Sequence, residues 1–479
     1  MSQAQTFYWH DYETWGAQPA VDRPAQFAGL RTDLDFNPIG EPLVIYAQPA
    51  DDFLPQPEAC LITGITPQIA SERGAPEADF FRFIHEELAR PGTCALGYNS
   101  LRFDDEVTRY GLYRNFFDPY AREWKNGNSR WDMIDVVRLT RALRPEGINW
   151  PEKEPGVTSF RLEDLTVAND IEHSGAHDAL ADVRATIALA RLLRERQGRL
   201  YEFALNNRDK QKLAAQLNVR AGNPVLHVSA RYPARLGCIA AVVPLAMHPS
   251  NRNGVIVYDL RTDPTPLLQM SAEQIRARLY TASADLPEGV ERIPLKVVHV
   301  NRSPVIVPMG TITDAAREQW QMDATSEQHH LAVLRGTPGL AVKLAEVFDA
   351  SDRFPPQTDP DRDLYGGFLS DEDRRRCDIV RRSAPEELGR LSLGFDASKL
   401  QELLFRYRAR NWPHTLDRDE RVRWEEFRLE RLTQPAAGAS IVLDDYRRQL
   451  SRLTVDPALT PGQRKVVNAL LDWPAELGL

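Results

Sequence analysis

Residues 1–195 alternate short apolar runs with amphipathic segments. Apolar runs of strand length occur at 7–9, 41–46 and 94–96. Apolar positions at helical spacing occur at 80–88 and 131–143. Strands that alternate with helices in this way predict an α/β domain built on a mixed sheet.

Residues 198–350 show a different pattern, in which short β-rich runs are separated by clusters of Pro and Asn. The runs lie at 225–228, 239–243, 254–258 and 295–300. Apolar runs of this length between turn-forming residues predict strands. The middle of the chain is therefore predicted to be a mostly β second domain.

The segment 353–360 has the composition of a linker, and apolar positions then recur at helical spacing. Helices are predicted at 371–381, 398–408, 417–432, 440–453 and 461–471. Together these patterns predict three domains, at 1–195, 198–350 and 351–479. That number also suits a chain of 479 residues.

The cysteines and the apolar runs indicate the cellular compartment in which the protein is expected. Cys60, Cys94, Cys238 and Cys377 are far apart and form no CxxC pair, which is typical of a reducing compartment without disulfides or a thiolate zinc site. The N-terminus has no signal-peptide pattern, and no apolar run is long enough to span a membrane. We therefore expect a soluble, cytoplasmic protein with no membrane partner.

The net charge of −9 does not by itself favour nucleic-acid binding, because a protein that binds DNA must neutralise phosphates. Residues 210–258, however, contain no Asp or Glu. The basic residues of this stretch are Lys210, Lys212, Arg220, Arg231, Arg235 and Arg252. The stretch is either a local phosphate-binding surface or an ordinary solvated face.

Two carboxylates, Asp11 and Glu13, follow the first predicted strand. Side chains two residues apart in a strand point to the same face, so both project together where the strand ends. Carboxylates this close repel one another unless a cation lies between them. Mg²⁺ and Mn²⁺ prefer such oxygen ligands, although an exposed acidic turn has the same pattern.

Two later segments add similar groups. Asp104, beside Asp105, lies near the start of a predicted helix, where acidic residues are common in any case. His177 lies on a loop or first turn, and Asp182 lies about one turn into the next predicted helix. A histidine titrates near neutrality and can act as a general base. Each segment alone is also consistent with a solvated surface.

In combination, the order DxE, FD and HxxxxD resembles the DEDDh exonuclease superfamily. The strings HDYETWG at 10–16, GYNSLRFDDEVTRY at 97–110 and IEHSGAHDALADV at 171–183 resemble the bacterial exonuclease I family, and KVVHVNRSP at 296–304 and DLYGGF at 363–368 extend this likeness over nearly the whole chain. The resemblance implies an α/β ribonuclease H-like exonuclease domain, a β-rich SH3-like domain, and an α-helical C-terminal domain packed against the latter in a C-shaped clamp.

The resemblance also implies a processive 3′→5′ exonuclease that degrades single-stranded DNA to 5′-mononucleotides by two-metal hydrolysis, in DNA repair or recombination. Asp11, Glu13, Asp104 and Asp182 would hold two Mg²⁺ ions, or Mn²⁺ in their place, and His177 would be the general base. The positions that match the family's substrate contacts are Glu13, Arg109, Tyr120, Trp124, Arg138, Arg161, Lys210, Asn253, Lys296 and His299.

Two other interpretations stay open: a 3′→5′ exoribonuclease of the same superfamily, and a non-catalytic scaffold that binds single-stranded DNA. The two added domains disfavour the first, and the five intact catalytic positions disfavour the second. The family also binds the acidic C-terminal tail of single-stranded DNA-binding protein, for which Arg144 and Phe203 are candidate contacts. Around 311–313 the chain lacks the basic residue that the family tends to carry. We expect a monomer.

Overall fold

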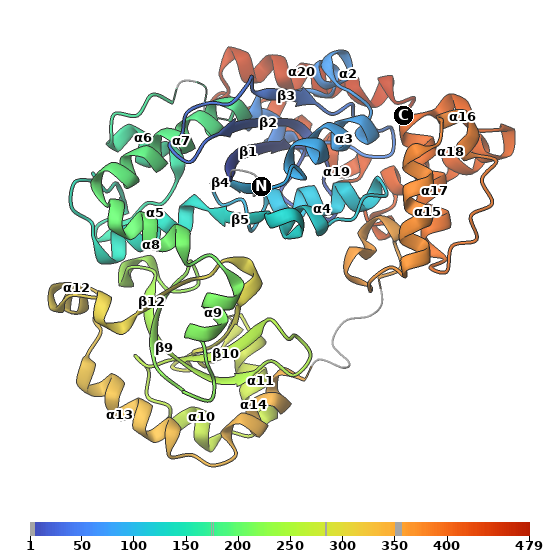
Figure 1. Cartoon of the computed structure of the whole chain (residues 1–479). Coiled ribbons are helices and arrows are strands. Elements are labelled where there is room, and N and C mark those ends of the chain that lie inside the picture. The colour runs from blue at the N-terminus through green and yellow to red at the C-terminus, as the bar shows by residue number, and fades with distance from the viewer. Residues whose placement is uncertain (1–4, 174, 176, 283–284, 350–356) are drawn as a thin grey trace. The chain divides into compact units, whose positions relative to one another are not determined.

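The fold is described from a computed structural model of the chain, for residues 5–173, 175, 177–282, 285–349 and 357–479. Contacts divide the chain into two compact units (Figure 1). Unit 1 consists of Met1–Ser129, His173–Ile187 and Pro356–Leu479, and unit 2 of Arg130–Glu172 and Ala188–Pro355. Within the described residues, no helix is both long enough and apolar enough to cross a membrane.

A five-stranded mixed sheet forms the centre of the N-terminal region. Its strands are β1 (Thr6–Thr14), β2 (Pro24–Thr32), β3 (Leu43–Tyr46), β4 (Thr93–Gly97) and β5 (Ser129–Asp132). They lie in the order β3-β2-β1-β4-β5, and β1 is antiparallel to β2 and parallel to β4. Strand β1 is central, and its run of large apolar residues is buried, as expected for a strand with neighbours on both sides.

Helices and a small hairpin complete this region. They are α1 (Pro57–Thr63), α2 (Pro67–Arg73), α3 (Glu77–Leu88), α4 (Asp104–Arg114), α5 (Met133–Leu143), the hairpin β6 (Glu152–Glu154) and β7 (Val157–Thr158), α6 (Leu162–Ala168), α7 (Ala179–Arg196) and α8 (Gly198–Asn206). The helix predicted at 131–143 begins two residues late. Trp131 belongs to β5, and the Asp132 carboxylate caps α5 by accepting from the backbone N of Ile134 at 3.2 Å.

The middle region, within unit 2, contains an antiparallel five-stranded sheet with the order β11-β10-β9-β8-β12. The strands are β8 (Val225–Val228), β9 (Ile239–Met247), β10 (Gly254–Asp259), β11 (Leu295–His299) and β12 (Val305–Pro308). The helices around it are α9 (Lys210–Gln216), α10 (Thr265–Gln269), α11 (Ala272–Tyr280), α12 (Asp314–Gln319), α13 (Ala324–Arg335) and α14 (Leu340–Phe348). All four predicted β-rich runs are strands.

The C-terminal region is helical, as predicted. Its helices are α15 (Asp371–Arg382), α16 (Pro385–Leu388), α17 (Lys399–Asn411), α18 (Arg418–Thr433), α19 (Leu443–Thr454) and α20 (Pro461–Glu476). Helix α20 runs past the predicted end at Leu471 and contains Pro474. Packing explains this extension, because Trp473 and Leu477 are both buried in an apolar cluster.

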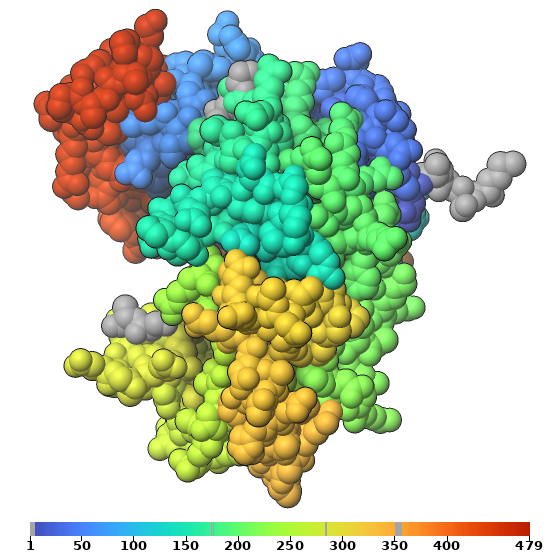
Figure 2. Space-filling model, turned by 90° about the vertical axis from the view of Figure 1, so that its left-hand side faces the viewer, coloured from blue at the N-terminus to red at the C-terminus, as the bar shows by residue number. Residues whose placement is uncertain are grey.

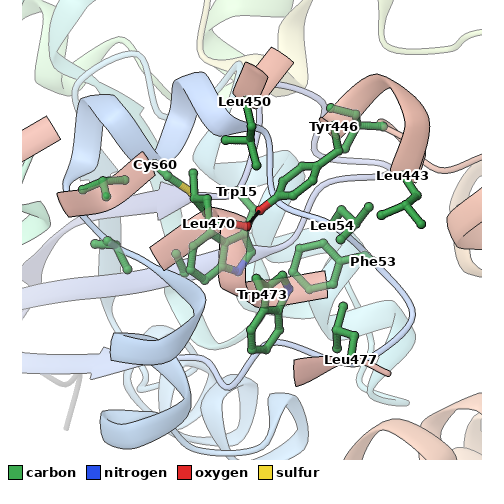
Figure 3. Packing of buried hydrophobic residues seen from close by; sticks show 14 of the residues in the cluster. Trp15, Phe53, Leu54, Cys60, Leu443, Tyr446, Leu450, Leu470, Trp473 and Leu477 are labelled. Carbon is green, nitrogen blue, oxygen red and sulfur yellow. Dashed lines mark hydrogen bonds between the residues drawn. The ribbon is translucent and has the colours of Figure 1, made fainter. Parts of the chain in front are cut away.

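That apolar cluster joins α19 and α20 to the N-terminal segment of unit 1. Trp15 and Phe53 pack beside Tyr446 and Trp473 (Figure 3), and the Tyr446 hydroxyl donates to the carbonyl of Leu470 at 2.7 Å. Within the described residues of unit 1, the apolar clusters of the helical region include side chains of the exonuclease region.

Buried ion pairs connect the same two regions. Arg410 on α17 donates to Asp52 and to Asp361, each at 2.7 Å. Asp52 also lies 3.7 Å from Arg431 on α18 and 4.0 Å from Arg23. The Asp52 side chain has no exposed surface. Burial alone would raise the pKa of its carboxyl, but Arg410 and Arg23 hold that pKa well below its ordinary value. The pairs therefore keep Asp52 charged inside unit 1.

Arg410→Ala should lower the free energy of unfolding by about 3–5 kcal/mol, because it leaves Asp52 and Asp361 buried without this partner. Urea unfolding of the whole chain measures the change. Arg375→Ala is the control, since Arg375 pairs with Glu372 on the surface of α15 and its loss should leave the unfolding midpoint unchanged. Equal midpoints for the two variants would show that the buried pairs do not hold the regions together.

Candidate active site

Strand β1 carries the first two carboxylates. Asp11 and Glu13 lie two residues apart, so their side chains leave the same face of the sheet. Glu13 lies opposite Gln26 of β2, and the pairing becomes irregular between Glu13 and Thr14, near the end of the strand. One carboxylate oxygen from each of Asp11, Glu13 and Asp182 lies within 4.8 Å of the other two. Strand β1 and helix α7 thus meet at an acidic cluster.

Helix α4 brings a fourth carboxylate. Asp104 is its first residue, is 3 % exposed, and accepts a hydrogen bond from the backbone N of Tyr12 at 3.1 Å. The adjacent Asp105 accepts from Nη2 of Arg122 at 2.7 Å in a fully buried pair. The two neighbouring acids therefore face different partners: Asp104 is held against the strand that carries Asp11, and Asp105 anchors the segment that contains Arg122.

The start of α7 carries the remaining two predicted groups. His177 lies in a turn before the helix and has φ 68°, a left-handed conformation that is uncommon for residues other than glycine. Asp178 caps the helix, since its Oδ1 accepts from the backbone N of Ala181 at 3.1 Å. Asp182 follows in the first turn. Residues 174 and 176 of this motif lie outside the described residues.

The electrostatics of the cluster show how close these acids are. Burial, and then repulsion by Asp104, Glu13 and Asp182, raises the pKa of Asp11 well above its ordinary value. Burial, and then the charges of Asp182 and Asp104, raises the pKa of Glu13 to about 9. Acids that raise one another's pKa favour a bound proton or cation. A donor set made of carboxylate oxygens fits hard divalent cations.

The raised pKa of Glu13 predicts that the cluster destabilises the metal-free fold as the pH rises. Between 4.5 and about 9 the folded state holds a proton that the unfolded chain has lost, so folding stability falls with increasing pH. In EDTA, Glu13→Gln should raise the free energy of unfolding at pH 8 by about 1–4 kcal/mol, the range for unit charges about 4 Å apart in water and at a protein surface. The gain should be much smaller at pH 5.

Urea unfolding at the two pH values measures this effect. Mg²⁺ should remove the advantage of Glu13→Gln, because the cation then stabilises the wild-type cluster. An equal gain at pH 5 and pH 8 would contradict the raised pKa of Glu13 as its cause.

Two polar side chains near the cluster were missed by the sequence analysis. Nε2 of His173 lies 2.5 Å from Oδ1 of Asp182. Gln26, which is 1 % exposed, donates from Nε2 to Asp178 at 3.4 Å and accepts from the backbone N of Ala179 at 3.3 Å. His173 lies inside the third motif and was visible there. Gln26 is distant in sequence from that motif, and nothing in its own segment marks it.

The other predicted substrate contacts of unit 1 lie on α4 and in the segment that follows it. Arg109 is buried between Glu106, at 2.5 Å, and Glu123, at 2.7 Å. Its guanidinium lies over the ring of the half-buried Tyr120, 5.6 Å from the centroid. Trp124 is 64 % exposed, and an exposed aromatic face suits stacking on a base. Arg109 is therefore already paired with carboxylates of the protein, whereas Trp124 is open to solvent.

Three predicted contacts lie together at one edge of the sheet of unit 2. His299 pairs with Gly254 between β11 and β10, and the carbonyl of the preceding Asn253 accepts from the backbone N of Val300 at 2.9 Å. Lys296, on the same strand as His299, donates to Oγ of Ser229 at 2.5 Å. The fold thus gathers Asn253, Lys296 and His299 around β11.

The other predicted contacts of unit 2 differ in exposure. Arg138 is buried and pairs with Asp135 at 2.8 Å. The Arg161 side chain is 74 % exposed just before α6, and Lys210 is exposed at the start of α9. The substrate-binding roles of all these residues stay predictions.

Arg144, the candidate contact for an acidic tail, lies in unit 2 where the end of α5 meets the segment around α12. Its Nη2 donates to the carbonyl of Thr311 at 3.1 Å, and nearby Nε1 of Trp320 donates to the carbonyl of Ala142 at 2.9 Å. In Figure 2 the gold segment around α12 lies against the teal segment of this unit. The side chain of Phe203, on α8, is half-buried.

The mixed sheet, with carboxylates converging from β1, α4 and α7, defines a ribonuclease H-like exonuclease domain. Family models agree: Exonuclease matches residues 8–190, Exonuclease I SH3-like domain residues 208–350, and Exonuclease I C-terminal domain residues 358–477. The chain belongs to the exodeoxyribonuclease I family.

Individual relatives support this assignment. Exodeoxyribonuclease I of Escherichia coli (strain K12) is 49 % identical over 475 residues, which cover 99 % of this chain and 98 % of the relative. The solved structure of a moderately thermophilic Exonuclease I from Methylocaldum szegediense is 53 % identical, with a TM-score of 0.95, and the match covers 99 % of this chain and 100 % of that one. The zinc ion bound E. coli ExoI–ssDNA complex is 46 % identical, with a TM-score of 0.94 and full coverage of both chains.

Proposed function

We propose that the protein is a Mg²⁺-dependent exonuclease that degrades single-stranded DNA from its 3′ end to nucleoside 5′-monophosphates. The observation that carries this proposal is the convergence of four buried or half-buried carboxylates at the end of β1, with His177 in the adjoining turn. The E. coli relative in complex with single-stranded DNA supports the substrate class. The 3′→5′ direction follows from the family resemblance.

In this mechanism Asp11, Glu13, Asp104 and Asp182 would hold two Mg²⁺ ions, and Mn²⁺ could replace them. When bound, the ions neutralise phosphate charge and stabilise the attacking and leaving oxygens. His177 accepts a proton from the attacking water, whose oxygen forms the new bond to phosphorus. The bond to the 3′ oxygen breaks, and this oxygen takes a proton from solvent water, which releases a 5′-mononucleotide and leaves a new 3′ hydroxyl on the strand.

We further propose that the strand is held along both units, which would make digestion processive. Exposed aromatic side chains stack on bases, and basic groups follow the phosphates. The residues proposed for these contacts are Glu13, Arg109, Tyr120, Trp124, Arg138, Arg161, Lys210, Asn253, Lys296 and His299. Removal of single strands in this way suits a role in DNA repair or recombination.

A digest of 5′-labelled single-stranded DNA and RNA of the same sequence, in Mg²⁺ and in EDTA, tests the proposal. We expect a ladder that shortens from the 3′ end, only with DNA and only in Mg²⁺. Comparable digestion of RNA would favour the exoribonuclease. Binding of DNA without digestion would favour the non-catalytic scaffold.

A protein partner and a monomeric state are part of the proposal. A pocket for the acidic tail of single-stranded DNA-binding protein needs a basic group beside an apolar wall, and Arg144 and Phe203 are the candidates. Arg144 already donates to the carbonyl of Thr311, so a tail carboxylate would have to use the other donors of its guanidinium.

Lys210→Ala/Lys212→Ala should weaken binding to long single strands and shorten the run length. Both lysines lie at the start of a segment that contains no Asp or Glu, and contacts to phosphates give DNA binding its dependence on salt. Turnover of a short oligonucleotide should stay near the wild-type rate. Run length and turnover at two salt concentrations measure the difference.

The matched control is Arg464→Ala/Lys465→Ala, which removes the same charge from exposed positions of α20. Equal losses on long and short substrates would show that Lys210 and Lys212 support the fold or the active site rather than the strand.

A further inference from the structure

His173 lies beside the carboxylate cluster, yet the mechanism above gives it no role. Its Nε2 is 2.5 Å from Oδ1 of Asp182, and its side chain is only 5 % exposed. The two residues are nine positions apart in the chain. The contact therefore holds the segment before α7 against the first turn of that helix, where Asp182 projects toward β1.

Asp182 needs a partner of this kind. Its carboxylate shares a small space with Asp11 and Glu13, and like charges this close repel one another. An aspartate side chain can escape such repulsion by rotating into another rotamer. A hydrogen bond to Oδ1 opposes that rotation. Because a carboxylate accepts at both oxygens, a donor at Oδ1 does not prevent ligation through Oδ2.

The backbone of the same turn is fixed separately. Gln26 on β2 donates to the Asp178 carboxylate and accepts from the backbone N of Ala179, so the first turn of α7 is tied to the sheet without His173. Loss of the histidine should consequently change the orientation of the Asp182 side chain rather than the position of the helix.

We propose that His173 is a positioning residue for Asp182: its Nε2–H orients the carboxylate toward Asp11 and Glu13 and thereby sets the affinity of the cluster for divalent cations. This inference rests on the proposed metal-dependent function. Hydrogen-bonded partners of ligating side chains typically change metal affinity by about 10–100-fold. His177 keeps the role of general base, and His173 acts only through Asp182.

The experiment is a titration of the metal-free full chain with Mn²⁺ alone, followed by the rise in melting temperature and by calorimetry. His173→Leu removes the donor, and His173→Gln places an amide N–H near the position of Nε2. The control, His414→Leu, removes an exposed histidine of the same unit. His173→Leu should need about 10–100-fold more Mn²⁺ than the wild type, His173→Gln should recover most of that loss, and the control should match the wild type.

Activity gives a second measurement. At saturating Mn²⁺ the turnover of His173→Leu should approach that of the wild type, whereas at limiting Mn²⁺ it should fall far below. Should His173→Leu fail to fold, His173→Asn takes its place, because its shorter amide cannot reach Asp182 while His173→Gln can. Equal Mn²⁺ affinity of the wild type and the donor-free variant would overturn the inference.

Tighter Mn²⁺ binding by His173→Leu would also overturn it, since His173 would then be competing with the cation for Asp182. The response of the wild type to Mn²⁺ tests the proposed function separately from the role of His173. If the wild type shows neither a Mn²⁺-dependent rise in melting temperature nor hydrolysis, the proposed function is wrong. If it responds and His173→Leu responds at the same concentrations, only the role of His173 is wrong.

Discussion

Asp11→Ala should abolish hydrolysis of single-stranded DNA while the fold stays intact. The side chain lies among Glu13, Asp104 and Asp182, so its removal deletes an oxygen ligand and relieves repulsion at the same time. Metal ions supply several kcal/mol of transition-state stabilisation, and each 1.36 kcal/mol corresponds to about a tenfold change in rate. We therefore expect a loss of about 10³-fold or more, measured by the release of mononucleotides in Mg²⁺.

The melting temperature separates this effect from unfolding. In EDTA, Asp11→Ala should melt at or above the wild-type temperature, because a source of repulsion is gone. Glu41→Ala removes an exposed carboxylate of the same region and should leave the rate unchanged. If Asp11→Ala kept more than about a tenth of the wild-type rate, the two-metal assignment would be wrong.

His177→Ala should slow turnover by roughly 10²–10⁴-fold, the usual contribution of a general base. Affinity for single-stranded DNA should change little, since the imidazole acts on the water proton rather than on the strand. The pH–rate profile of the wild type should rise as the base loses its proton, and this rise should disappear in the variant. Single-turnover rates from pH 5.5 to 8.5 measure both effects.

His414→Ala, at an exposed position, is the control for loss of a histidine. An unchanged rate in His177→Ala, with a profile that still rises through neutrality, would place the general base elsewhere. A large loss of DNA affinity would instead indicate that His177 contacts the strand.

Local patterns in the sequence were sufficient for most elements of the fold. Period-two and helical spacing depend on neighbours a few residues away, and the strands around 225–300 and the five long C-terminal helices were predicted in this way. The errors arise where distant contacts decide the outcome. Helix α20 continues through Pro474 because Trp473 and Leu477 are buried against the N-terminal segment.

For the site, the sequence alone determined the chemical class: carboxylates and a histidine whose types and order are those of an exonuclease. Only the tertiary structure decided which groups meet. It brings Asp182 within reach of Asp11 and Glu13, separates Asp104 from Asp105, and adds His173 and Gln26. The physical reason is that each residue's side-chain chemistry can be read from the sequence at that position. The distances between β1, α4 and α7, in contrast, depend on strand pairing and on packing between segments up to more than a hundred and sixty residues apart.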